Sequence, residues 1–107
     1  MSKYHAHKTT VDGITFDSMK EAARYQQLKR MEQGGYISDL ELQVRYRLIP
    51  TQRGGLRTER PCDYIADFRY TKDGQTVVED TKGVRTPEYI IKRKLMKQVY
   101  GIEVVEI

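Results

Sequence analysis

The stretch that decides the fold is residues 64–82, YIADFRYTKDGQTVVEDTK. Asp73-Gly74 lies between two runs rich in β-branched and aromatic residues, and Asp-Gly suits the two-residue type I′ loop of a β-hairpin. Because such a loop fixes the register of the hairpin, it places Asp67 opposite Asp80. Lys82 follows two residues along and points to the same face of the sheet. The sequence therefore predicts two facing carboxylates with an amine beside them.

Two carboxylates that face each other across a hairpin repel and destabilise it. A divalent cation between them would turn this repulsion into a binding site. The alternative is that Asp67 and Asp80 are ordinary surface carboxylates of edge strands. Aspartate is disfavoured in strand interiors, so two such exceptions opposite each other favour a site. Glu79 points to the other face, opposite Phe68, and is the weaker candidate.

The length and composition of the chain favour one globular domain, taken as residues 1–107. No apolar run approaches the roughly 20 residues that a membrane helix needs, and residues 1–8 lack the apolar core of a secretory signal. The single cysteine, Cys62, excludes an internal disulfide and is interpreted as a small apolar filler. These features predict a cytoplasmic protein with no membrane partner and a mobile arm over residues 1–10.

The positive charge is concentrated in two segments. The formal net charge is +4, and residues 84–100 carry five basic residues against one glutamate. Residues 51–60 carry three arginines against one glutamate. Local basic patches suit a polyanion, although a solvated helix face and a solvated loop would explain the same pattern. The candidate contacts to nucleic-acid phosphates are Arg53, Arg57, Arg85, Lys92, Arg93, Lys94 and Lys97.

The N-terminal half of the chain predicts a helix followed by a strand. Ser18 and Glu21 have the spacing of a capping box, and Gly34-Gly35 ends the helix. Residues 36–49 are β-rich, with apolar and polar side chains that alternate along the second part of the run. A short hairpin or turn is expected at residues 11–16.

The C-terminal half predicts a second helix and a last strand. Gly54-Gly55 is expected to form a mobile loop before the central hairpin. Thr86-Pro87 starts the helix with threonine as the cap, Gly101 ends it, and residues 102–107 are expected to form a strand. A stripe of aliphatic side chains at helical spacing is expected to face the sheet: Ile91, Leu95 and Val99. The order is therefore helix, three strands, helix, strand.

Glu21 is the third candidate acid. A capping-box glutamate has a structural role, and this interpretation remains open. However, Glu21 shares a helix face with Tyr25 and Leu28, and this face is expected to point toward the sheet. A carboxylate in that position needs a partner, because burial of an unpaired charge is unfavourable. The two roles are compatible.

The candidate ligands are all oxygen atoms, which favours Mg²⁺ or Mn²⁺ over zinc. They are the carboxylates of Glu21, Asp67 and Asp80 and the backbone carbonyl of Thr81. Lys82 would hold or deprotonate the attacking water, or stabilise the charged phosphate. The natural substrate of such a site is a phosphodiester. His5 and His7 lie on the expected arm and are not expected to bind the metal.

These residues resemble the PD-(D/E)xK nuclease superfamily, which includes restriction enzymes and Holliday-junction resolvases. Its motif is an acid on one strand and acid-x-Lys on the next, often with a glutamate on an upstream helix, and here these are Asp67, Asp80-Thr81-Lys82 and Glu21. The proline usual before the first acid is replaced by Ala66. Residues 16–22, 35–43 and 64–68 are similar to a small phage- and prophage-borne family of uncharacterised proteins in that superfamily.

The resemblance implies an α/β, restriction-endonuclease-like αβββαβ core with a mixed sheet flanked by two helices. It also implies a divalent-metal-dependent endonuclease on DNA, selective for branched or junction structures and homodimeric, because two strands need two sites. Gln43 and Gln98 are weaker site candidates. There are two alternatives. One is a nucleic-acid-binding module with this fold and no catalytic activity, and the other is a small structural or adaptor protein.

Overall fold

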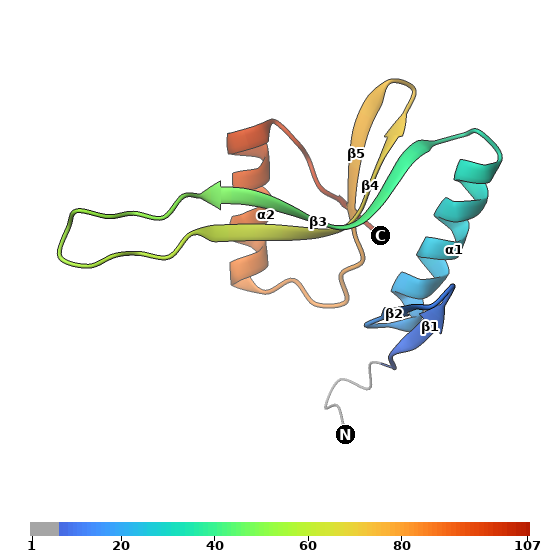
Figure 1. The fold of residues 1–107 in the computed structure, drawn as a ribbon, viewed down its shortest axis with the longest axis horizontal. Coiled ribbons are helices and arrows are strands. Elements are labelled where there is room, and N and C mark those ends of the chain that lie inside the picture. Colours follow the sequence, from blue (N-terminus) through green and yellow to red (C-terminus); the bar gives the residue numbers. More distant parts are fainter. Residues whose placement is uncertain (1–6) are drawn as a thin grey trace.

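The computed structural model describes residues 7–107 and folds them into an α/β domain (Figure 1). In chain order the elements are β1 (Thr9–Val11), β2 (Ile14–Phe16), α1 (Met19–Gln33), β3 (Ser38–Ile49), β4 (Cys62–Lys72), β5 (Gln75–Asp80), α2 (Pro87–Tyr100) and β6 (Val105–Glu106). The predicted order of helix, three strands, helix and strand is confirmed, with the hairpin β1–β2 added before it.

The main sheet has four strands in the order β3-β4-β5-β6. The pairs β3–β4 and β4–β5 are antiparallel, and β6 pairs parallel to β5, so the sheet is mixed. The last strand is shorter than the predicted residues 102–107. No helix among residues 7–107 has the length and apolar character needed to cross a membrane.

The central hairpin has the predicted register. Lys72 pairs with Gln75, and the pairing continues without a shift to Phe68 and Glu79. Asp73 has a φ of 51° and Gly74 a φ of 76°, as a type I′ loop requires. Local turn chemistry therefore sets which residues of β4 and β5 face each other.

Both helices begin and end where their caps predict. The Ser18 hydroxyl accepts a hydrogen bond from the backbone N–H of Glu21, and the Thr86 hydroxyl accepts one from that of Tyr89. Gly34 is the C-cap of α1, and Gly101 ends α2 with a φ of 69°. Glycine is favoured at this position, because the backbone there is left-handed.

The predicted apolar stripe of α2 is wrong as a description of the buried face. Ile91 and Val99 are 58% and 48% exposed, whereas Tyr89 and Met96 are buried. Leu95 is partly buried and packs at the edge of the core. The spacing of aliphatic residues indicates a helix but does not determine which side meets the sheet, and here the sheet packs against an aromatic ring and a methionine.

The core has two clusters, and β4 contributes to both. Phe68 and Tyr70 pack with residues of α1, while Tyr64 and Ala66 pack with residues of α2. The packing partners of β4 therefore change at Asp67. This position lies between the two clusters, where polar side chains can reach the surface.

One prediction about the chain outside the core needs correction. The predicted arm extended to residue 10, but Thr9 and Thr10 belong to β1. Residues 1–6, including His5, lie outside the described residues, and His7 is exposed. Gly54-Gly55 lies in a loop, as predicted, and this loop ends an extension of the β3–β4 hairpin that projects from the body (Figure 1).

Candidate active site

Asp67 and Asp80 lie at the point where the β4–β5 pairing ends. The last backbone pair is Phe68 with Glu79, and Asp67 and Asp80 are the next residues on the side away from the hairpin loop. Instead of a further backbone pair, Oδ2 of Asp67 accepts hydrogen bonds from the backbone N–H and the hydroxyl of Thr81, both at 2.8 Å. The Asp67 side chain thus binds the start of the segment that follows β5.

The pairing of β4 with β5 does not continue to Ile65 and Lys82, which the register of the hairpin would place opposite each other. Strand β5 ends at Asp80, and Ile65 pairs with Arg45 of β3 on the other side of β4. The Asp67–Thr81 contacts explain the end of the ladder, because the carboxylate takes the backbone N–H that a further ladder bond would use.

Asp80 is buried at the bottom of the site. Its side chain is 2% exposed, and Oδ2 accepts a hydrogen bond of 2.5 Å from the hydroxyl of Tyr64. Burial, together with the neighbouring Asp67, raises the pKa of Asp80 to about 6, while Tyr64 and Lys82 act to lower it. A carboxylate buried beside another carboxylate holds its charge poorly unless a cation is near.

Glu21 reaches the same place from the first turn of α1. It is 6% exposed, and its Oε1 accepts a hydrogen bond of 3.2 Å from Nε2 of Gln43. The same nitrogen lies 3.4 Å from Oδ1 of Asp67. Burial first, and then the negative charges of Asp67, Asp17 and Asp80, raise the pKa of Glu21 to about 7. The side chain thus belongs to the site and not only to the helix cap.

Gln43 connects the carboxylates of Glu21 and Asp67. Its backbone has a φ of 52°, a left-handed conformation that is strained for a residue other than glycine and is often found at functional sites. The amide N–H₂ of Gln43 places a partial positive charge between Glu21 and Asp67, where a cation would also be attracted. The weaker candidate Gln43 therefore lies in the cluster, while Gln98 is an exposed residue of α2.

Lys82 is the amine of the cluster. Its Nζ lies 3.5 Å from Oδ1 of Asp80 and 4.6 Å from the centre of the Tyr89 ring. The side chain borders a cavity of about 330 Å³ beside the start of α2, together with Tyr64, Thr86 and Lys92 among others. The ammonium group is therefore held next to Asp80 and faces an open space.

The donor set of the cluster fits a hard cation in its chemistry. The available ligands are carboxylate and carbonyl oxygens, which Mg²⁺ and Mn²⁺ prefer. Burial and the neighbouring carboxylates raise the pKa values of Glu21 and Asp80, so a cation beside them would favour their charged forms. In the part of the chain that the structure describes, no three His, Cys, Asp or Glu side chains are grouped closely enough to hold an ion.

Glu79 has a different role from Asp80, as its face of the strand predicts. It is 1% exposed and accepts two hydrogen bonds from Arg24, at 2.8 and 2.6 Å. The hydroxyl of Tyr70 donates to the same carboxylate. This contact fastens α1 to β5 three residues after Glu21. Neither Arg24 nor Tyr64 is identifiable from the sequence, because their partners are known only once the helix and strands are placed.

Most of the predicted DNA contacts in residues 84–100 have acidic partners within the chain. Glu106 binds Arg85 at 2.8 Å and Arg93 at 3.0 Å. Hydrogen bonds from Tyr89 and Arg85 help to lower the pKa of Glu106 to about 2. Lys92 pairs with Glu88 at 3.2 Å and Lys97 with Glu103 at 2.9 Å. Lys94 is exposed and makes no ion pair within residues 7–107.

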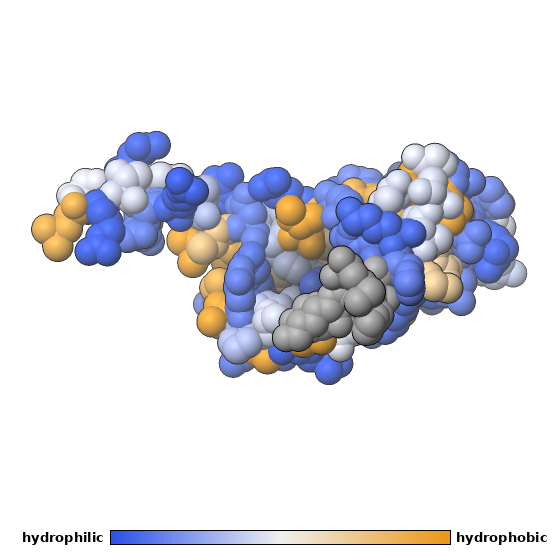
Figure 2. Space-filling model, turned by 90° about the horizontal axis from the view of Figure 1, so that it is seen from below, coloured by the Kyte–Doolittle hydropathy of each residue, from blue (hydrophilic) through white to orange (hydrophobic). Residues whose placement is uncertain are grey.

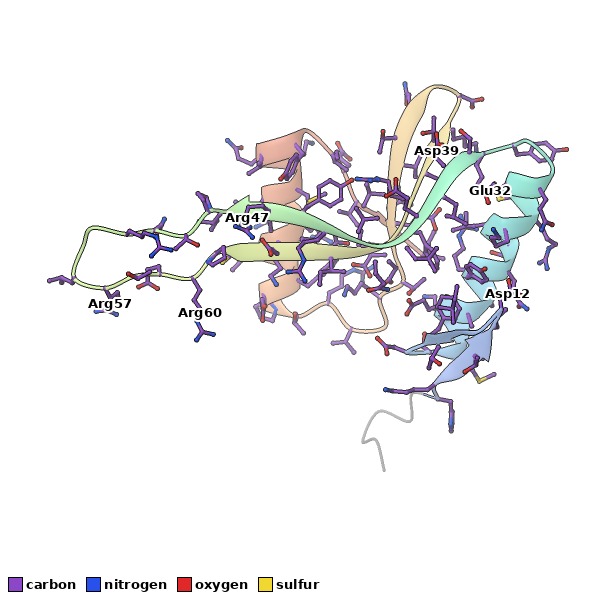
Figure 3. All side chains as sticks on the ribbon, in the orientation of Figure 1. Asp12, Glu32, Asp39, Arg47, Arg57 and Arg60 are labelled. Atoms are coloured by element: carbon purple, nitrogen blue, oxygen red, sulfur yellow. The ribbon has the colours of Figure 1, made fainter. Side chains whose placement is uncertain are left out.

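Arg57 lies on the extension of the β3–β4 hairpin, away from this helix (Figure 3), and Arg53 belongs to the same segment of the chain. Figure 3 also labels Arg47 near the end of β3, and this residue pairs with Asp63 at 2.5 Å. The structure thus brings together Glu21, Asp67, Thr81, Asp80 and Lys82, whereas the predicted phosphate contacts are distributed over two separate parts of the molecule.

No curated protein and no solved structure is significantly similar to the chain. One family model, described as "Protein of unknown function (DUF1064)", matches residues 1–105 and therefore nearly the whole domain, from the N-terminal residues through the carboxylate cluster to β6. The chain belongs to the DUF1064 family.

Proposed function

We propose that this protein is a divalent-metal-dependent endonuclease that hydrolyses phosphodiester bonds of DNA. The observation that carries the proposal is the convergence of Glu21, Asp67 and Asp80 from α1, β4 and β5, with Lys82 3.5 Å from Asp80. The shared contacts of Gln43 with Glu21 and Asp67 support it. A cluster of buried carboxylates with raised pKa values is a typical feature of a catalytic or metal-binding site.

Each residue has a role that follows from its position. Glu21, Asp67 and Asp80 would hold Mg²⁺ or Mn²⁺, with the carbonyl oxygen of Thr81 as a further ligand. Such an ion, when bound, lowers the pKa of a water molecule and offsets phosphate charge. The ammonium group of Lys82 orients the attacking water or offsets negative charge on the phosphate, because it borders the open cavity beside Asp80.

The DNA backbone would be held by basic side chains on both sides of this site. Lys94 and the arginines of the β3–β4 extension are the first candidates, since Arg85, Arg93 and Lys97 would exchange an acidic partner for a phosphate. A domain of this size has little surface for reading a long sequence. Selectivity for branched or junction DNA and a homodimer with two active sites are parts of the same proposal.

Cleavage assays test the proposal directly. Linear, nicked, flapped and four-way DNA are incubated with Mg²⁺ or Mn²⁺ and wild type, Lys82→Ala or Lys72→Ala. We expect metal-dependent cleavage by wild type and a loss of about 10²-fold or more in Lys82→Ala. Lys72 is an exposed lysine of the same hairpin, so Lys72→Ala should cleave like wild type. Equal cleavage by the Lys82→Ala and Lys72→Ala variants would reject the role of Lys82.

A DNA-binding module without chemistry is the second candidate. Two observations favour it. Oδ2 of Asp67 already accepts two hydrogen bonds from Thr81. Within residues 7–107, no three His, Cys, Asp or Glu side chains are grouped closely enough to hold an ion. Such a module would bind DNA with the same affinity with and without Mg²⁺, and in both wild type and Asp80→Asn. Metal-dependent cleavage that Asp80→Asn abolishes would exclude it.

A further inference from the structure

The β3–β4 hairpin continues beyond the sheet as a thin projection, here called the projecting hairpin (residues 50–61; Figure 1). Its two chains are joined at Gln52 and Glu59, whose backbone groups form hydrogen bonds of 3.0 and 2.8 Å. The segments after β3 and before β4 are therefore still paired with each other. The projecting hairpin is a built extension of the two strands that carry Gln43 and Asp67.

The end of the projecting hairpin is narrow and carries one apolar side chain. Leu56 is 100% exposed, so it contributes nothing to the packing of this chain. Gly54 has a φ of +85°, and an added Cβ at Gly54 or Gly55 would meet no atom within 4 Å. Figure 2 shows the projection as mostly hydrophilic, with a hydrophobic group at its far end. Leu56 is the one aliphatic residue of residues 51–60.

Arginines surround this apolar tip. Residues 51–60 contain Arg53, Arg57 and Arg60 against Glu59. Arg57 lies 3.9 Å from Glu59, and within residues 7–107 neither Arg53 nor Arg60 forms an ion pair. Figure 3 shows Arg57 and Arg60 on the projecting hairpin, away from the body of the domain. The surface therefore combines unpaired positive charge with one exposed aliphatic side chain. This combination suits a polyanion that presents flat apolar groups between its negative charges.

We propose that the projecting hairpin inserts Leu56 between bases of DNA at a branch point, while its arginines bind the flanking phosphates. The inference rests on the proposed function for its substrate class. Apolar side chains that enter between base steps, with arginines on the neighbouring backbone, are a general mode of DNA binding. Insertion requires unstacking, which is least unfavourable where pairing is already interrupted. The projecting hairpin thus favours branched DNA over linear duplex.

The geometry also relates the branch point to the cleavage site. Leu56 at the end of the projecting hairpin lies eleven residues before Asp67, and an extended chain of this length spans at most about 36 Å at ~3.3 Å per residue. This distance corresponds to about 11 base pairs of B-form DNA at ~3.4 Å each. Cleavage should therefore fall within about one helical turn of the branch.

The test uses a four-way junction with 2-aminopurine next to the branch, in buffer with EDTA so that no cleavage occurs. Wild type should increase the 2-aminopurine fluorescence severalfold, because the probe brightens when it is unstacked. Leu56→Ala should lose at least half of this increase, and Leu56→Met should keep it. Ile14→Ala removes an exposed aliphatic side chain from the β1–β2 hairpin and should behave like wild type.

An equal increase with wild type and Leu56→Ala would overturn the inference, even if the protein is an active nuclease. A change in the sedimentation coefficient of free Leu56→Ala, with unchanged fluorescence, would overturn it as well, since Leu56 would then contact a second copy. A Leu56-dependent increase without any nuclease activity would support the inference and reject the proposed function. The two proposals can therefore fail separately.

Discussion

Glu21 and Asp80 are carboxylates whose pKa values the fold raises well above their ordinary range. The pKa of Glu21 is raised to about 7 and that of Asp80 to about 6, in both cases chiefly by burial, and Asp67 repels the charge of each. Both groups are nearly inaccessible, with 6% and 2% exposure. Ionisation of these carboxylates therefore lowers the stability of the folded state.

Stability should fall as pH rises through the titration of this cluster. The folded pKa of Glu21 is above its ordinary value of 4.5, so the folded state binds more protons than the unfolded state between pH 4.5 and about 7. This contribution is fully present below pH 4.5 and is lost above about pH 7. Removal of the titration in Glu21→Gln should therefore stabilise the protein at pH 8, relative to wild type, by on the order of 2 kcal/mol.

Urea unfolding of wild type and Glu21→Gln at pH 5 and pH 8 measures this effect. The variant should show the smaller loss of unfolding free energy between the two pH values. Asp63→Asn serves as the control, because Asp63 lies on β4 with Arg45 and Arg47 as partners, outside the cluster. An identical pH dependence for wild type and Glu21→Gln would show that Glu21 titrates normally.

At the level of elements, Arg24 and Glu79 hold the first helix against the sheet. The ion pair is bidentate, and Glu79 is 1% exposed, so its charge depends on Arg24 and on the hydroxyl of Tyr70. Arg24 lies one turn after Glu21 on α1. The pair therefore supports the fold and at the same time sets the position of Glu21 relative to Asp80.

Arg24→Met should destabilise the protein by about 3–5 kcal/mol, because it leaves a buried carboxylate without its cation. Arg30 is an exposed arginine in the last turn of the same helix, and Arg30→Met should change stability by no more than about 0.5 kcal/mol. Urea unfolding at pH 7 compares the two. If Arg24→Met were as stable as Arg30→Met, the ion pair would not be the fastening between α1 and β5.

The elements themselves were predictable because their signals are local. Ser18, Thr86, Gly101 and the Asp73-Gly74 loop each act on neighbouring backbone groups, and their effect does not depend on the rest of the fold. The buried face of α2 was not predictable in the same way. Ile91 and Val99 have the right spacing for a core stripe, but the sheet meets the side of the helix that carries Tyr89 and Met96.

At the scale of the whole molecule, the predicted site depends on contacts between segments far apart in the chain. Asp67 and Asp80 could be paired from the sequence because one two-residue loop fixes their register. Gln43 could be named but not placed, and Tyr64 was missed, since their contacts follow from the packing of β3 and β4 against other elements. The acidic partners of the basic helix residues, Glu103 and Glu106, were missed for the same reason.

The ion pairs of α2 predict an uneven salt dependence of DNA binding. Lys94 makes no ion pair within the described residues, so Lys94→Ala should reduce the slope of log affinity against log salt by about 0.9. Arg93 is already bound to Glu106 at 3.0 Å, and Arg93→Ala should reduce the slope by less than half as much. Fluorescence anisotropy with duplex DNA at several salt concentrations gives both slopes. A larger effect for Arg93 than for Lys94 would contradict the assigned pairing.

The most direct test of the central claim is calorimetric titration of the free protein with Mn²⁺. Wild type should give a saturable binding heat, and Asp80→Asn should weaken the affinity by at least about tenfold. Asp63→Asn should bind like wild type, because Asp63 is held by Arg45 and Arg47 on the same strand as Asp67. Mn²⁺ binding that is absent in wild type, or equal in wild type and Asp80→Asn, would contradict the assignment of these carboxylates to a metal-dependent active site.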